Sequence, residues 1–479
     1  MNFGTGLDHF VIFIYFSIII LIALRTGKKQ QVKSGLTSLQ LEEEQFLAGR
    51  NIGPWQSVFS IIATEVSTLT FLGIPAFCFN QNFSILHFYF GAFLGRFIIA
   101  KYLLPKIYQK HITVYSTFGK ASGSVSAQKL ITVIFIINKV LAVGVRLFSG
   151  SILIKEFFGL DIYTSITLVT ACTFAYTFIG GLKAVIMTDV MQFFIFVFGG
   201  FIALYLIPDY GNSNFSEYFN SALDLNKLSL FPKNGVSSII FGLMGGFLFD
   251  ISTHGIDQDF AQRLLSTRTR QAAQKSIFIS GIFSILVSSL FLLVGAFLYV
   301  YFQEYTYPEG VKADYLFAWF ITNYFPAGIK GFMVAAVMAT TMSSLDSAIN
   351  AIMSVVFCDL RQEIDIKDYK KLYVRDIILT TFAFLIIAFI SSQSSQILIL
   401  GLKLASWTGG TLLAVVGLGL FYADRLRFNF KSVFISYALS LGFIYLFHVR
   451  MNSPWELNVY IGFIIPILIH FFFFKKSKT

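Results

Sequence analysis

Apolar segments long enough to cross a lipid bilayer recur along the whole chain, and they constrain its fold more than any other feature. Hydrophobic residues make up 56% of the 479 residues and charged residues only 13%, which is too little charge for the surface of a soluble protein of this size. In lipid, a helix satisfies its own backbone hydrogen bonds. We therefore predict an all-α polytopic membrane protein with about 13 transmembrane helices in contact with the lipid bilayer.

The predicted membrane spans are segments of roughly 16 to 28 residues. They lie at 9–24, 55–79, 84–104, 130–157, 162–179, 184–207, 237–256, 276–302, 329–354, 375–391, 395–421, 432–448 and 457–474. The first span has no small-residue cleavage site, so we expect a retained N-terminal helix within residues 1–30 rather than a signal peptide.

The distribution of Lys and Arg predicts how the chain threads the membrane. With the N-terminus outside, roughly 25 of the 36 basic residues fall in cytoplasmic segments and about six in outer ones. Arg263 counts among the cytoplasmic group, whereas Arg96, Lys139 and Arg146 fall within spans or at their ends. We expect a cell (inner) membrane protein with a cytoplasmic C-terminus. The net charge of +11 follows this topology and does not indicate a nucleic-acid partner.

A row of hydroxyls and a carboxylate lies inside the span at 329–354. Thr340, Ser343, Ser344 and Ser347 share one face of a helix, and Asp346 widens that face. Hydroxyl and carboxylate oxygens suit a hard cation such as sodium, and an intramembrane Asp is costly without a partner. The alternative is a helix-packing face of small residues whose hydroxyls bond their own backbone, which explains the serines but not Asp346.

Two other spans contain residues that weaken a helix. The segment 62–76 holds Glu65, four hydroxyl residues, Gly73 and Pro75, and the segment 241–255 holds several glycines and Asp250. Breaks at matching positions in two halves are typical of inverted-repeat transporters, whose sites lie near the midplane. The two segments are five spans apart, so we predict a five-helix inverted repeat at about 55–207 and 237–421.

Four segments together resemble the sodium:solute symporter family. They are Phe46–Arg50, Gly180–Gln192, Asp257–Arg263 and Ala339–Asn350. The resemblance covers about residues 46–425, and it leaves 432–479 as two further transmembrane helices and a tail. It implies the five-helix inverted-repeat fold and sodium-coupled symport of a small solute into the cell, with sodium as the co-transported ion.

The resemblance also implies ion ligands. The family's sodium site, carried across, uses the backbone carbonyls of Ala63 and Val66 with the hydroxyls of Thr340, Ser343 and Ser344. A helix break releases carbonyls, and five oxygens suit a small hard cation.

Some family members bind a second sodium near an aspartate that matches Asp189, whose partners here would be Ser343, Asp346 and Ser347. Asp189 could instead complement the start of a cytoplasmic helix after Lys183. Asp346, where other members have a small residue, could strengthen a second ion site, pair with a base or carry a proton.

The family resemblance also implies which residues contact the solute. The matching positions are Glu65, Ser67 and Thr70 on the first broken span, Asp250, Thr253 and His254 on the second, and Arg146 on the span at 130–157. If Arg146 pairs with Glu65 or Asp250, the pocket suits a neutral sugar or polyol. If it is free, an anion such as a sialic acid or a short carboxylate fits better. Glu65 would repel a carboxylate, which favours the sugar, and His254 could cap its half-helix.

Other functions have less support. The carboxylates Glu65, Asp250 and Asp346 leave a proton-coupled carrier open. The six His residues are scattered, and no nucleophile–base pair is recognisable, so we do not expect an enzyme. Cys78, Cys172 and Cys358 lack metal-site spacing. The sequence leaves the oligomeric state undetermined.

Overall fold

The computed structural model describes residues 4–28, 38–109, 111–177, 181–231, 237–361, 366–393, 397–451 and 454–476. The predicted boundary at residue 30 and the last three residues lie outside these ranges. The helices are α1 (Gly6–Lys28), α2 (Ser38–Leu47), α3 (Pro54–Glu65), α4 (Ile74–Asn80), α5 (Leu86–Ile98), α6 (Leu104–Ile107), α7 (Val114–Ser122), α8 (Val125–Phe158), α9 (Ile162–Thr177) and α10 (Leu182–Tyr210). They continue with α11 (Phe215–Asp224), α12 (Ser237–Ile256), α13 (Gln258–Leu265), α14 (Arg270–Glu304), α15 (Ala313–Tyr324), α16 (Ile329–Val355), α17 (Ile366–Ser391), α18 (Ile397–Tyr422), α19 (Phe430–Tyr445) and α20 (Glu456–Phe473).

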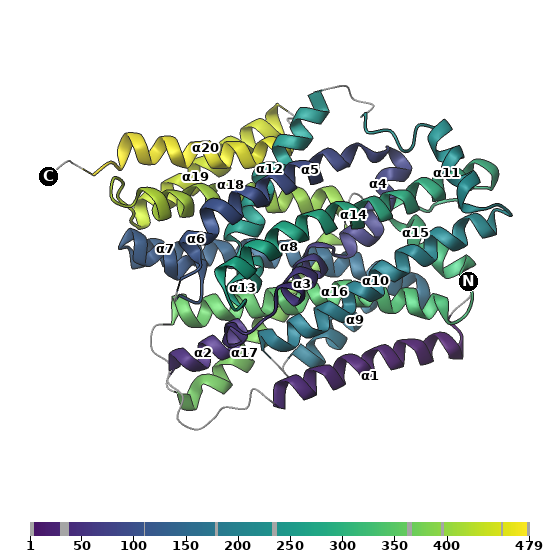
Figure 1. The fold of residues 1–479 in the computed structure, drawn as a ribbon, viewed down its shortest axis with the longest axis horizontal. Helices are drawn as coiled ribbons and strands as arrows, with labels where there is room; N and C mark the ends of the chain where they lie inside the picture. The colour runs from purple at the N-terminus through teal and green to yellow at the C-terminus, as the bar shows by residue number, and fades with distance from the viewer. Residues whose placement is uncertain are drawn as a thin grey trace.

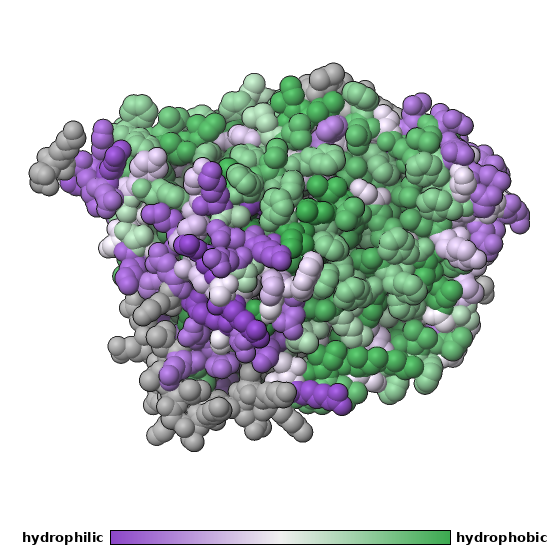
Figure 2. Space-filling view, viewed as in Figure 1, coloured by the Kyte–Doolittle hydropathy of each residue, from purple (hydrophilic) through white to green (hydrophobic). Residues whose placement is uncertain are grey.

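The helices that can span a membrane confirm the predicted fold class. Among the described residues, eleven helices are long and apolar enough, or 12 if the bent pair α3 and α4 counts as one span. The helix α9, with 16 residues, occupies the position of the remaining predicted span. The long helices run nearly side by side in Figure 1. Figure 2 shows that hydrophobic residues cover the middle of this face, whereas hydrophilic residues gather toward its two ends, as expected for a protein surrounded by lipid.

The first predicted break is present. The helix α3 ends at Glu65, and Val66 has φ −78° and ψ 83°, outside helical geometry. The chain then bends by 62° between α3 and the segment that begins at Thr70. Gly73 and Pro75 follow the bend, where the backbone forms a wide π turn over Leu69–Gly73. Proline lacks an N–H donor, so it is tolerated near the start of α4.

The second predicted break is displaced. The helix α12 is continuous from Ser237 to Ile256, so the prediction of a break within 241–255 is wrong. Its glycines serve packing instead: a Cβ on Gly246 would lie 1.9 Å from the Phe88 carbonyl oxygen of α5. In the same contact, a Cβ on Gly91 of α5 would lie 2.0 Å from the Leu243 carbonyl oxygen of α12. Such close helix approach is the common role of small residues in membranes. The chain turns only at Asp257, the N-cap of the short buried helix α13.

The helix α16 lies at the centre of the bundle, where it packs against α1, α3, α8 and α10. Nearly all its residues are buried, including every hydroxyl of the predicted ion-binding face. The core helices therefore place the break after α3, the end of α12 and the polar face of α16 inside the protein. The division into two repeats at 55–207 and 237–421 stays a prediction.

Candidate functional site

A cavity of about 140 Å³ lies between α3, α5, α8, α12 and α18. All seven residues predicted to contact the solute line it: Glu65, Ser67, Thr70, Arg146, Asp250, Thr253 and His254. Phe88, Tyr89 and Phe249 add aromatic surface. The wall thus combines charged and apolar groups, as small-molecule sites commonly do.

Arg96 of α5, which the sequence analysis left unassigned, neutralises the carboxylates of this wall. Its side chain is fully buried. Its Nη2 donates to Glu65 Oε2 at 2.6 Å, and its Nε donates to Asp250 Oδ1 at 3.3 Å. Nη1 donates to Ser280 Oγ at 2.8 Å, and Ser284 Oγ donates to the second oxygen of Glu65 at 2.5 Å. Two carboxylates and one guanidinium therefore join the end of α3 to α5 and α12.

His254, in the last turn of α12, joins this cluster. Its Nδ1 lies 2.8 Å from Asp250 Oδ1, and its Nε2 lies 3.2 Å from Arg96 Nη2. The same Nε2 lies 3.5 Å from Glu65 Oε2, so the imidazole contacts both carboxylates and the guanidinium of the cluster. Asp250 Oδ2, in contrast, has no hydrogen-bond partner among the described residues.

Arg146 has different surroundings from those predicted. The expected pairing with Glu65 or Asp250 is wrong, because Arg96 holds both carboxylates. Within the described part of the chain, no carboxylate oxygen lies within 4.0 Å of the Arg146 guanidinium. Its Nη1 donates only to the Thr64 carbonyl, at 3.4 Å, beside the break after α3. Arg146 therefore brings a positive charge to the cavity and makes no direct ion pair with the described residues.

Lys139 lines the same cavity two helical turns before Arg146 on α8. It is paired: its Nζ lies 2.7 Å from Asp257 Oδ2 and 3.2 Å from Asp259 Oδ2. Asp257 is the N-cap of α13, and Asp259 lies in its first turn. These ion pairs therefore join α8 to the start of α13 beside the cavity.

The predicted sodium hydroxyls lie together on α16. Thr340 Oγ1 donates to the Val337 carbonyl at 2.9 Å, and Ser344 Oγ donates to the Thr340 carbonyl at 3.1 Å. This is the backbone bonding considered as the alternative to an ion site, and it is compatible with one. A hydroxyl that donates its proton to the helix keeps its oxygen lone pairs for a cation.

The predicted carbonyl ligands lie at the break. In a continuous helix, the amides of Ser67 and Thr70 would bond the carbonyls of Ala63 and Val66. Here Ser67 N donates to the Glu65 carbonyl at 3.0 Å, and Thr70 N donates to the Ser67 carbonyl at 2.8 Å. Near this point Thr64 Oγ1 lies 3.3 Å from Ser347 Oγ, so the break is beside the polar face of α16.

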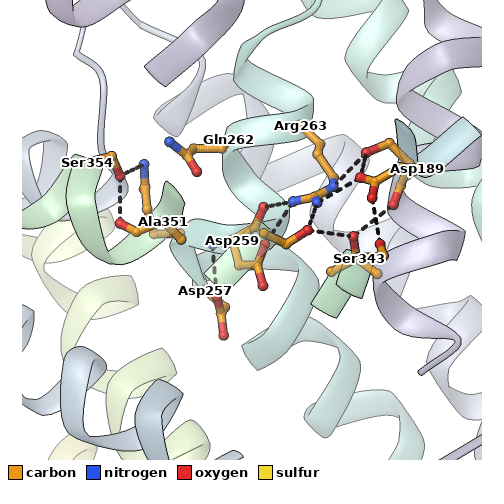
Figure 3. Close-up of polar contacts among 12 residues, drawn as sticks. Asp189, Asp257, Asp259, Gln262, Arg263, Ser343, Ala351 and Ser354 are labelled. Carbon is orange, nitrogen blue, oxygen red and sulfur yellow. Dashed lines mark hydrogen bonds and ion pairs between the residues drawn. The ribbon is translucent and has the colours of Figure 1, made fainter. Parts of the chain in front are cut away.

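Asp189 lies in a second buried cluster, shown in Figure 3. Ser343 and Ser60 donate to its two oxygens, each at 2.5 Å, and Arg263 Nη2 lies 3.1 Å from Oδ2. Arg263 also bonds Ser347 and pairs with Asp259 Oδ1 at 2.8 Å. Asp189 is in the second turn of α10, so the alternative of a first-turn helix start is wrong.

The charge count placed Arg263 in a cytoplasmic segment, and this orientation stays a prediction. Its side chain is fully buried beside Asp189. Of the predicted second-site partners, the structure joins Ser343 to Asp189 directly and Ser347 through Arg263. Asp346 is 1% exposed on α16, and its role stays a prediction.

Comparisons with known proteins assign the chain to a family. The model of the sodium:solute symporter family matches residues 45–436. The chain belongs to this family. The sodium/sialic acid symporter SiaT of Proteus mirabilis is 25% identical over 370 residues, which cover 75% of this chain and 72% of SiaT. The sodium/glucose cotransporter of Vibrio parahaemolyticus is 26% identical over 384 residues, which cover 74% of this chain and 69% of that protein.

A solved structure supports the same fold. The substrate-bound, outward-open state of a Na⁺-coupled sialic acid symporter matches with a TM-score of 0.84 at 22% identity, over 100% of both chains. The protein is thus a sodium-coupled solute symporter with many membrane-spanning helices, and not an enzyme. The names of its relatives differ in the solute, so they leave the solute of this symporter open.

The charged residues of the candidate site that the sequence analysis did not assign in this symporter are Arg96, Lys139 and Arg263. A signal for them was present. Glu65, Asp189 and Asp250 are carboxylates within apolar spans, and such groups need buried partners. Counting intramembrane carboxylates against intramembrane cations would have identified candidate partners, although not which cation meets which carboxylate.

Proposed function

We propose that this symporter imports a small organic anion together with sodium, and that Arg146 binds the anionic group. The unpaired guanidinium of Arg146 at the cavity wall carries this proposal. A buried cation without a direct ion pair is costly, and Arg146 has none among the described residues, so the carboxylate of a solute would supply one. Arginine suits this role because its planar fork can donate two parallel hydrogen bonds to a carboxylate.

The earlier preference for a neutral sugar or polyol depended on two premises. The first was that Arg146 pairs with Glu65 or Asp250, and Arg96 makes those contacts instead. The second was that Glu65 repels a carboxylate. Arg96 and Ser284 bind both oxygens of Glu65, which reduces its effect on a nearby anion. Asp250 Oδ2, without a partner among the described residues, is an acceptor for a hydroxyl or amine of the solute.

The ion site that we propose uses the carbonyls of Ala63 and Val66 and the hydroxyls of Thr340, Ser343 and Ser344. Sodium there would join the broken helix to α16 and so order Ser67 and Thr70, which follow the break and line the solute cavity. This connection couples the two ligands, typically by about 1–3 kcal/mol. The orientation with the N-terminus outside, in the inner membrane, would let the inward sodium gradient drive uptake.

Uptake into proteoliposomes tests the proposal. Under an imposed sodium gradient, we expect labelled short organic acids or sialic acids to accumulate, and a proton gradient alone to fail. Arg146→Met should raise the half-saturating acid concentration by about tenfold or more, equivalent to about 1.4 kcal/mol or more of binding. Arg270→Met, which removes an exposed arginine at the start of α14, is the matched control and should leave uptake unchanged.

Accumulation of a neutral sugar that survives Arg146→Met would contradict the proposal. Uptake that is driven by protons and does not depend on sodium would contradict the sodium site. Glu65 and Asp346 would then be the candidates for coupling uptake to protons.

A further inference from the structure

The N-terminal helix α1 lies outside the predicted five-helix repeat but has a buried face. Asp8, Tyr15, Ile19 and Ala23 are each no more than 4% exposed. Their spacing of seven, four and four residues places them on one side of the helix. This side packs against α16 and α10, along the lower edge of the bundle in Figure 1. The two contacted helices carry Ser343 and Asp189.

Asp8 caps the first turn of α16. Its Oδ1 accepts hydrogen bonds from the amides of Gly328 at 2.8 Å and Gly331 at 2.7 Å. Thr5 holds the other oxygen through its amide and its hydroxyl, both at 2.8 Å. A Cβ on Gly331 would lie 2.5 Å from the Asp8 carbonyl oxygen, so only glycine allows this approach. A carboxylate from another helix thus satisfies donors at the positive end of the α16 dipole.

Tyr15 contacts the same helix further along, beside the ion-binding face. Its hydroxyl accepts from Gln192 Nε2 at 3.2 Å and donates to Met342 Sδ at 3.7 Å. Met342 directly precedes Ser343, and Gln192 lies three residues after Asp189 on α10. The Tyr15 hydroxyl therefore bridges α10 and α16 next to the bond between Ser343 and Asp189.

We infer that α1 is part of the sodium-binding machinery, with Asp8 and Tyr15 as positioning residues that hold α16 against α10 at the level of Ser343. Asp8 determines where α16 begins, and Tyr15 determines the spacing of the two helices near the ion. A shift of α16 along or away from α10 would displace Ser343 and Ser344 together. The inference rests on the proposed sodium site and is independent of the identity of the solute.

Sodium binding to the purified full-length protein, measured by titration calorimetry without solute, tests the inference. Tyr15→Phe removes one hydroxyl with little change in shape, and Asp8→Asn removes the charge but keeps an acceptor. We expect each variant to raise the half-saturating sodium concentration by about two- to fivefold, the range set by one cap or one hydrogen bond. In uptake assays at saturating sodium, solute half-saturation should stay unchanged.

Tyr437→Phe is the matched control. Tyr437 is a buried tyrosine of α19 whose hydroxyl has no partner within the described residues, so its removal should not change sodium binding. Equal sodium affinity in Tyr15→Phe, Asp8→Asn and the unmodified protein would overturn the inference, as would an equal loss of sodium and solute affinity. Ser343→Ala is measured in parallel. If it too leaves sodium binding unchanged, the proposed sodium site itself is wrong.

Discussion

Two buried arginines, Arg96 and Arg263, each hold two carboxylates, yet their surroundings differ. The partners of Arg263 are sealed: Asp189 and Asp259 have side-chain exposures of 0% and 1%. One partner of Arg96, Glu65, is 16% exposed, and Asp250 keeps one oxygen without a partner among the described residues. The Arg263 cluster joins α3, α10, α13 and α16 behind the proposed ion site, whereas the Arg96 cluster forms part of the cavity wall.

The difference in exposure indicates different roles for the two arginine–carboxylate clusters. A fully paired, sealed cluster resists rearrangement, because breaking any contact leaves a buried charge uncompensated. A cluster that lines a cavity can exchange partners with solute or water at lower cost. We therefore expect the Arg263 cluster to support the fold and the ion site, and the Arg96 cluster to influence solute binding.

The largest expected effect is that of Arg263→Met. It leaves Asp189 and Asp259 buried without their guanidinium, and such a loss costs about 3–5 kcal/mol of unfolding free energy. We expect a strongly reduced melting temperature and poor recovery of monodisperse protein in detergent. The double variant Arg263→Met/Asp189→Asn should recover part of the stability, and a single variant with normal melting would contradict the buried pairing.

Arg96→Met should destabilise the protein less than Arg263→Met, because Glu65 reaches the cavity and can be solvated there. Its solute half-saturation should rise as well, since Glu65 would then repel an anionic solute. Thermal unfolding and uptake of the same preparation measure both effects. Equal stability losses in the two arginine variants would remove the distinction between the clusters.

Ser343→Ala tests whether the Arg263 cluster supports sodium binding. It removes a predicted sodium ligand and the hydrogen bond to Asp189. We expect the half-saturating sodium concentration to rise by about tenfold, which corresponds to about 1.4 kcal/mol. Thr341→Val is the control, because the Thr341 hydroxyl bonds Val337 and lies against the position of Gly150, away from the predicted ligand set.

The smallest effect is expected for Ser280→Ala on the Arg96 side. Ser280 accepts one bond from Arg96 Nη1, and Arg96 keeps both carboxylates after the change. The loss of unfolding free energy should be about 1 kcal/mol, with sodium half-saturation unchanged. A change in sodium affinity here would show that the two clusters are not independent.

Much of the site could be predicted from the sequence where the information is local. Helical periodicity places Thr340, Ser343, Ser344 and Ser347 on one face of α16, and Gly73 and Pro75 mark the bend that follows α3. The same local logic failed for Gly242 and Gly246. A glycine that breaks a helix and a glycine that admits a neighbouring helix look alike in sequence, and only the contact with α5 distinguishes them.

The sequence alone determined the membrane class, the approximate helices, the family and seven of the residues that line the cavity, because hydropathy, periodicity and motifs are properties of neighbouring residues. Only the tertiary structure decided which cation meets which carboxylate. Arg96 and Asp250 are 154 residues apart, and Arg263 and Asp189 are 74 apart. Coulomb energy depends on distance in space, and helix packing sets that distance. The fold therefore decides that Glu65 pairs with Arg96 and not with Arg146.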